Sequence, residues 1–149
     1  MRKALVVVTL VSLVAFALQF VFAAVGAFTK PASEGAYALH SVTGMAVIPV
    51  LILLTTLFAV LAKAPGRLIG LAILPLGLVV LQALIAMLAN ASTDTAGAST
   101  PFGLAIGGLH ALNGIIAVHV VVSVHQAARR LADPTPAGAS AVVGEREPA

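Results

Sequence analysis

Cysteine is absent from this chain, and charged residues are scarce. The lack of cysteine excludes disulfides, thiolate metal sites, iron–sulfur clusters and a haem attached covalently through a C-x-x-C-H motif. Only 9% of the 149 residues are charged, whereas soluble globular domains carry about 25%. Together with 60% hydrophobic residues and a mean hydropathy of +1.12, this scarcity indicates an integral membrane protein.

Four stretches of the sequence contain no Asp, Glu, Lys or Arg. Each is longer than the roughly 20 apolar residues that cross a bilayer core, so the sequence predicts four transmembrane helices. Their expected ranges are about 4–28, 36–62, 68–89 and 102–124. Short connections between them favour an all-α, up-down-up-down four-helix bundle. Pro49 and Pro75 fall inside two of these ranges and are expected to kink their helices.

The basic residues stand at the helix ends and form no patch with aromatic residues, so the pI near 10 does not indicate nucleic-acid binding. With four crossings, six of them fall on one side: Arg2, Lys3, Lys63, Arg67, Arg129 and Arg130. The positive-inside rule then predicts a multi-pass protein of the cell (cytoplasmic) membrane with both termini in the cytoplasm. The lipid bilayer is the partner that the composition predicts.

The two ends of the chain differ in character. The first apolar segment exceeds the 7–15 residues of a signal-peptide h-region, so we expect an uncleaved helix. Residues 1–131 then form the transmembrane domain. Residues 132–149 are rich in Pro, Ala and Gly without periodicity, which predicts a disordered cytoplasmic tail.

Two pairs of similar motifs indicate an internal repeat. "HSVTG" at 40–44 resembles "HALNG" at 110–114, and "QFVFAAVG" at 19–26 resembles "QALIAMLA" at 82–89. The first two helices therefore look like a weak repeat of the last two. Equivalent helices run in the same direction, so the sequence predicts a parallel two-plus-two repeat with its axis along the membrane normal.

The repeat places four polar side chains at similar depth: Gln19, His40, Gln82 and His110. At a rise of 1.5 Å per residue, each lies roughly 6–14 Å from the outer end of its helix. Lipid offers no hydrogen-bond partner at that depth, so we expect all four to face the bundle interior. Small residues share their helix faces, which leaves either a groove or room for close helix contact.

One hypothesis for these residues is a haem b site in which His40 and His110 are the axial metal ligands. Gly44 and Gly114, one turn away, would let the flat macrocycle approach the backbone. Gln19 and Gln82 could donate to the propionates or to the second ring nitrogen of a histidine. Asn113, which belongs to the same motif as Gly114, completes the candidate cofactor-binding set.

The alternative is a structural role, in which the same histidines and glutamines only make interhelical hydrogen bonds. Such bonds contribute about 0.6–2 kcal/mol each. In that interpretation Gly103 and Gly107 form a helix-packing motif, and the protein is a non-catalytic membrane subunit or scaffold.

Other metals and other chemistry fit the sequence less well. Zinc needs three or four protein ligands, and no acidic residue or cysteine lies at this depth. Copper would favour methionine, but Met45 and Met87 lie roughly 140° around their helices from the polar residues, which predicts a packing role. His119 lies on the opposite helix face from His110, and His125 lies beside the terminal arginines, so both are expected outside the site.

The sequence offers no candidate catalytic residue and leaves the enzyme question open, with a non-enzyme favoured. The hydroxyl residues within the apolar stretches have no nearby acid or histidine to activate them: Thr9, Ser12, Thr55 and Thr56. No carboxylate lies within the apolar stretches, which makes a proton-coupled transporter the third and least favoured hypothesis. The protein partners left open are a redox partner and a second copy of this chain.

The motifs resemble those of a family of uncharacterised small bacterial four-helix membrane proteins, catalogued as a domain of unknown function. The shared pieces are Leu18-Gln19, His40–Gly44, Lys63–Arg67, Leu81-Gln82 and Leu109–Gly114. The resemblance covers nearly everything from residue 4 to residue 130. Members often carry arginine after the first histidine, whereas this chain has Ser41. If that arginine contacts a propionate in other members, its loss weakens the haem hypothesis here.

The histidine pattern is also similar to one half of haem A synthase and, more loosely, to membrane cytochromes of the b type. This resemblance implies haem between histidines on paired helices, and hence electron transfer or haem handling. It is a similarity of pattern and not of extended sequence.

Overall fold

The computed structural model describes residues 1–31, 33 and 35–133, and within them all the regular elements are helices. Four helical stretches are long and apolar enough to span a membrane, which confirms the predicted all-α fold class. The first is α1, the third is α4 and the fourth is α5, while the second is built from three consecutive segments. Their bounds are α1 Arg2–Phe28, α2 Ala38–Val42, η1 Thr43–Val47, α3 Ile48–Leu61, α4 Gly66–Ala91 and α5 Pro101–Ala132. Residues 134–149 of the predicted tail lie outside the described part.

The largest difference from the predicted bounds is at the end of α5, which continues to Ala132 instead of stopping near residue 124. The prediction followed the apolar run and ended where polar residues begin. The helix continues because alanine, leucine, glutamine and arginine are good helix formers. Arg129 and Arg130 also lie in its last turn, where a positive charge complements the helix dipole.

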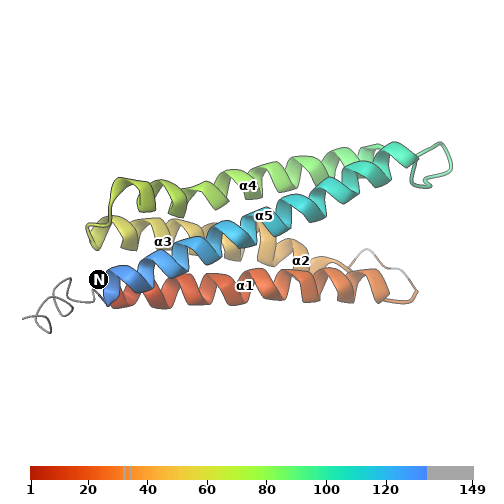
Figure 1. Ribbon diagram of the computed structural model, residues 1–149. Helices are drawn as coiled ribbons and strands as arrows, with labels where there is room; N and C mark the ends of the chain where they lie inside the picture. The colour runs from red at the N-terminus through yellow and green to blue at the C-terminus, as the bar shows by residue number, and fades with distance from the viewer. Residues whose placement is uncertain (32, 34, 134–149) are drawn as a thin grey trace, which may run out of the picture.

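The helices form a closed set of neighbours, because α1 and α4 each pack against both α3 and α5. The connecting loops lie alternately at the two ends of the molecule (Figure 1). We call the end with Met1, the α3–α4 loop and Ala132 the basic end, since the predicted cluster of basic residues flanks these points. The opposite end, with the loops 29–37 and 92–100, is called the site end.

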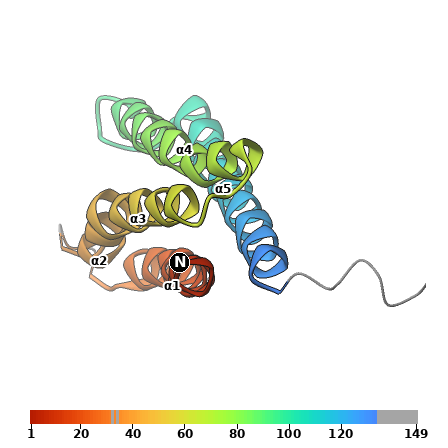
Figure 2. The same cartoon turned by 90° about the vertical axis from the view of Figure 1, so that its left-hand side faces the viewer.

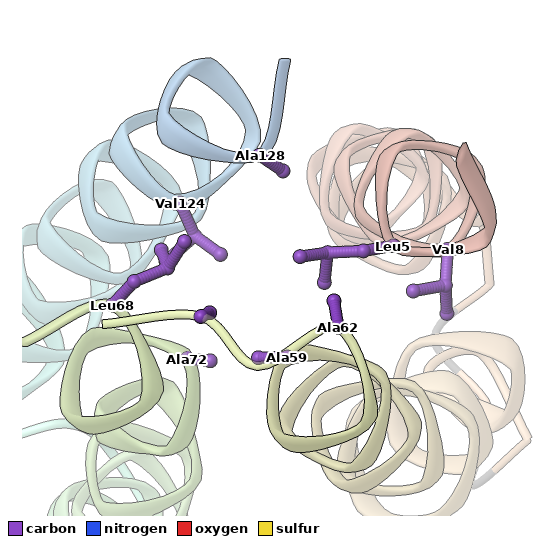
Figure 3. Packing of buried hydrophobic residues seen from close by; sticks show 9 residues of the cluster. Leu5, Val8, Ala59, Ala62, Leu68, Ala72, Val124 and Ala128 are labelled. Carbon is purple, nitrogen blue, oxygen red and sulfur yellow. The ribbon is translucent and has the colours of Figure 1, made fainter. Parts of the chain in front are cut away.

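The buried core fills the basic end and the middle of the bundle. At the basic end, Figure 3 shows small and aliphatic side chains from α1, the α3 region, α4 and α5 converging on one another. The buried members of this cluster are Leu5, Val8, Ala59, Ala62, Ala64, Leu68, Ala72, Val124 and Ala128. A second cluster around Phe16, Ile48 and Ile52 fills the middle. Small residues allow the close helix approach that stabilises membrane bundles through van der Waals contact.

Figure 2, seen from the basic end, shows α1 beside α3 and α4 beside α5. The first and second membrane-spanning stretches therefore form one pair, and the third and fourth form another. The tight α3–α4 turn joins the two pairs. Ala64 N–H donates to Ala59 O at 3.0 Å, and Lys63 has a φ of 53°, the left-handed conformation that commonly ends a helix.

The site end is closed by a short ordered loop between α4 and α5. Asp94 Oδ1 accepts hydrogen bonds from the N–H groups of Ala96 and Ala98, both at 2.9 Å. Thr100 caps α5 by accepting from Gly103 N–H at 3.1 Å, and its hydroxyl donates to Ser92 O at 2.7 Å. Pro101 occupies the first turn of α5, as the sequence predicted.

The second membrane-spanning stretch contains a π-helical turn, Thr43–Val47, directly before Pro49. Proline has no N–H to donate, and its ring crowds the carbonyl four residues earlier, which is that of Met45. A wider turn accommodates this local conflict. The sequence predicted a kink at Pro49 but not the π turn, which separates His40 in α2 from the regular helix α3.

Candidate functional site

A cavity of about 470 Å³ lies at the site end, and residues of all four membrane-spanning stretches line it. Its volume falls in the range typical of small-molecule sites. The structure brings every predicted cofactor-binding residue to this cavity: Gln19, His40, Gly44, Gln82, His110, Asn113 and Gly114. The buried apolar clusters lie toward the middle and the basic end.

Each histidine contacts the glutamine of its own half of the repeat in the same way. His40 Nδ1 lies 3.0 Å from the backbone oxygen of Gln19, and His110 Nδ1 lies 3.2 Å from the backbone oxygen of Gln82. The sequence hypothesis had the glutamine side chains donating to a propionate or to a histidine ring nitrogen, whereas in the structure the glutamine main-chain carbonyls accept from the rings. The paired helices lie close enough here for the backbone itself to be within reach of the rings.

These two contacts identify the nitrogen of each ring that carries a hydrogen. A carbonyl oxygen only accepts hydrogen bonds, so Nδ1 of each imidazole carries the hydrogen and donates it. In a neutral ring Nε2 then holds a free lone pair, and neither Nε2 makes a hydrogen bond to the described residues. Metal-binding histidines commonly use this arrangement, in which one ring nitrogen donates to a carbonyl and the other binds the metal.

The two imidazoles both line the cavity, and they lie close to each other. Their ring centroids are 6.2 Å apart and their planes are tilted by 48°. Two imidazoles on opposite sides of one metal ion are separated by about 6 Å, from two metal–nitrogen bonds of about 2 Å and two ring radii of about 1 Å. The observed centroid separation is close to that value.

Within the described residues, no group of three or more His, Cys, Asp or Glu side chains is close enough to hold a metal ion. Two histidines alone do not make a zinc site, which needs at least three protein ligands.

In the second half of the repeat, both polar atoms of the glutamine side chain make hydrogen bonds. Gln82 Nε2 donates to the backbone oxygen of His110 at 2.7 Å, while Gln82 Oε1 accepts a short hydrogen bond from Asn113 Nδ2. Asn113 also donates to Leu78 O at 2.9 Å and is only 6% exposed. Asn113 therefore ties α5 to α4 beside His110.

The first half lacks this support. Gln19 Oε1 is buried and has no hydrogen-bond partner in the described residues. Thr43 occupies the position equivalent to Asn113, and no side-chain hydrogen bond joins it to Gln19. A Cβ atom on Gly44 would lie 2.5 Å from Gln19 Nε2, so glycine makes room for the Gln19 amide there.

Sequence reasoning missed several residues of the cavity wall. Tyr37 meets His40 edge to face, with ring centroids 6.4 Å apart, and its ring covers Gly26. Met45 and Met87 line the cavity although the sequence predicted packing roles for them, and both are largely exposed, at 73% and 67%. They lie at the cavity's exposed rim. The motif analysis could not reveal them because they belong to no polar pattern.

The other two histidines lie away from the cavity. His119 is exposed on α5, on the surface that faces lipid if the bundle spans the membrane. His125 is half-buried near the basic end, where its Nδ1 lies 2.8 Å from Thr9 Oγ1. Thr9 is fully buried and its hydroxyl donates to Val6 O, so His125 Nδ1–H is the donor to Thr9. The sequence predicted a solvated His125, whereas it joins α5 to α1.

Comparison with known proteins gives one match. Residues 19–90 match the model of DUF6220, a family of unknown function. No curated protein matches the chain, and no solved structure matches it. The matched range is just under half of the chain and contains Gln19, His40, Gly44 and Gln82. The chain thus resembles an uncharacterised family of small helical proteins, as its motifs predicted.

Proposed function

We propose that this protein is a b-type haem protein of the cell membrane, in which His40 and His110 are the axial ligands. The observation that carries the proposal is the pair of imidazoles, 6.2 Å apart, each donating through Nδ1 to a backbone carbonyl. Both rings are thereby oriented, and both retain a free Nε2. Iron in the bound haem would supply one-electron chemistry, which suits electron transfer or haem handling.

The cavity supports this proposal through its shape and lining. Its volume and mostly apolar wall suit a flat hydrophobic group. Gly114 leaves ordinary contact distances to Gln82 Nε2 and Phe20, at 3.6 and 3.9 Å. The amide of Gln19 and the side chain of Asn90 are polar groups of the wall that could face propionates. With the basic end in the cytoplasm, the site would lie in the outer half of the bilayer.

A structural role is the second candidate, and one observation favours it. In the second half, the hydrogen bonds among His110, Gln82 and Asn113 close on one another without any ligand. Bonds of this kind stabilise membrane helix pairs. The protein would then be a non-catalytic membrane subunit, possessing a cavity but no cofactor.

The visible absorption spectrum distinguishes the two candidates. The protein is produced in cells supplied with haem, purified in detergent and compared with the variants His40→Ala, His110→Ala and His119→Ala. The proposal predicts a Soret band for wild type, an altered or absent band for the two site variants, and an unchanged band for His119→Ala, because His119 lies away from the cavity. A folded wild type without a Soret band would overturn the haem proposal.

A further inference from the structure

We propose that the two histidines hold unequal positions, with His110 the fixed ligand and His40 the exchangeable one. On this basis the site binds a small neutral diatomic molecule, of the type of carbon monoxide, in the place of His40. The inference rests on the proposed haem site and adds a ligand class to it. It follows from a difference between the two halves of the repeat.

His110 is fixed by the continuity of its helix and by its neighbours. It lies in α5, a single helix of 32 residues without an interruption. Its backbone oxygen accepts from Gln82 Nε2, its ring donates to the Gln82 backbone, and Asn113 holds the Gln82 amide in place. Moving His110 away from the cavity would break several of these bonds together.

His40 is held by much less. It lies in α2, a helix of five residues between the 29–37 loop and the π turn Thr43–Val47. Within the described residues, its side chain makes one hydrogen bond, from Nδ1 to Gln19 O. Tyr37, which meets the ring edge to face, belongs to the adjoining loop and is itself 47% exposed.

The π turn lies between His40 and the tightly packed part of the second membrane-spanning stretch. Single π turns within α-helices are frequent at functional sites, and their hydrogen bonds form a wider ring than those of an α-helix. Here the turn stands between His40 and α3, whose Ile48 and Ile52 belong to the packed middle cluster. Residues 38–42 therefore lie outside that cluster, on the other side of the π turn.

The buried polar atom without a hydrogen-bond partner, Gln19 Oε1, belongs to the same half of the repeat as His40. Gln19 Oε1 is buried without a donor in the described residues, and Gln19 Nε2 lies 2.5 Å from where a Cβ of Gly44 would be. A ligand that replaces His40 would bind next to this amide.

Carbon monoxide uptake by the reduced haem-loaded protein tests the inference. Stopped-flow absorption at the Soret band measures the uptake rate for wild type, His40→Ala, His110→Ala, Thr43→Asn and the control His119→Ala. Wild type should take up carbon monoxide at a rate that levels off with concentration, because His40 must leave first. His40→Ala should take it up about tenfold faster or more, since its site is always open.

The other variants test the asymmetry itself. His110→Ala should lose haem during purification, whereas His40→Ala should keep it. Thr43→Asn gives the first half the residue that supports Gln82 in the second half, and it should slow uptake. His119→Ala should behave as wild type.

Two results would overturn the inference while leaving the haem site standing. One is a wild type with a six-coordinate spectrum that takes up no carbon monoxide. The other is haem retention with rapid uptake by His110→Ala and haem loss by His40→Ala. If His110→Ala does not fold, wild type and His40→Ala decide the question alone. A wild type without any Soret band removes the proposed function itself.

Discussion

His110 and Gln82 are joined twice, once from the imidazole to the glutamine backbone and once from the glutamine side chain to the histidine backbone. This reciprocal link binds α5 to α4 in the part of the bundle that surrounds the cavity. The same imidazole-to-backbone bond recurs between His40 and Gln19, but the reciprocal side-chain bond does not. The two pairs therefore share one hydrogen bond of this link and differ in the other.

Replacement of Asn113 by alanine should lower the stability of the bundle. The change removes the hydrogen bonds to Gln82 Oε1 and Leu78 O, and it leaves Gln82 Oε1 without a donor. The expected loss is about 1–3 kcal/mol. Thermal unfolding in detergent measures it, with Asn90→Ala as the matched control because Asn90 is exposed. Equal unfolding temperatures for the two variants would contradict the proposed support.

Two glycines on α5 should respond to alanine in opposite directions. A Cβ on Gly103 would lie 2.6 Å from the backbone oxygen of Ser92, which cannot give way easily, whereas a Cβ on Gly107 meets nothing within 4 Å. Gly103→Ala should cost about 1–3 kcal/mol. Gly107→Ala should gain up to about 1 kcal/mol from helix propensity. A common effect of both changes on thermal unfolding would show that the α4–α5 loop packs differently.

Thr9→Val should loosen the basic end without affecting the cavity. The substitution nearly keeps the volume but removes the acceptor for His125 Nδ1. Interhelical bonds of this kind contribute about 0.6–2 kcal/mol in membranes, so the unfolding temperature should fall. The visible spectrum of the haem-loaded protein should stay that of wild type, since Thr9 does not line the cavity. A changed spectrum would mean that the two ends are coupled.

The orientation in the membrane can be tested directly because the chain has no cysteine of its own. Single cysteines at Thr95 and Asp133, both exposed, mark the site end and the basic end. In intact cells, a membrane-impermeant maleimide should label Thr95→Cys and not Asp133→Cys, since the basic end is expected in the cytoplasm. Labelling of Asp133→Cys alone would invert the assignment.

The membrane-spanning helices were predictable because hydrocarbon imposes a simple length and charge requirement. The candidate site was predictable for a related reason: a polar side chain within an apolar stretch must find a partner inside the protein. The repeat then indicated which partners, and it paired His40 with Gln19 and His110 with Gln82 correctly. The distance between the two rings could not be predicted, because it depends on the angle at which the helix pairs cross.

Other features depend on the path of the backbone, so the pattern of residues could not predict them. The main-chain oxygens of Gln19 and Gln82 accept from the histidine rings, whereas the sequence pointed to their side chains as donors. The π turn before Pro49 depends on how the chain resolves a missing hydrogen bond, and several solutions have the same sequence signature. The extension of α5 to Ala132 was not predicted, because the apolar run ends before the helix does.

The uneven filling of the bundle has a thermodynamic consequence. Apolar packing holds the basic end and the middle, while at the site end the four helices surround open volume. A molecule that fills this volume binds the folded chain and not the unfolded one, so it raises stability by mass action in proportion to the logarithm of its concentration. The unfolding temperature in detergent therefore serves as a binding assay that needs no chromophore. It can be used to search for any occupant of the cavity, haem included.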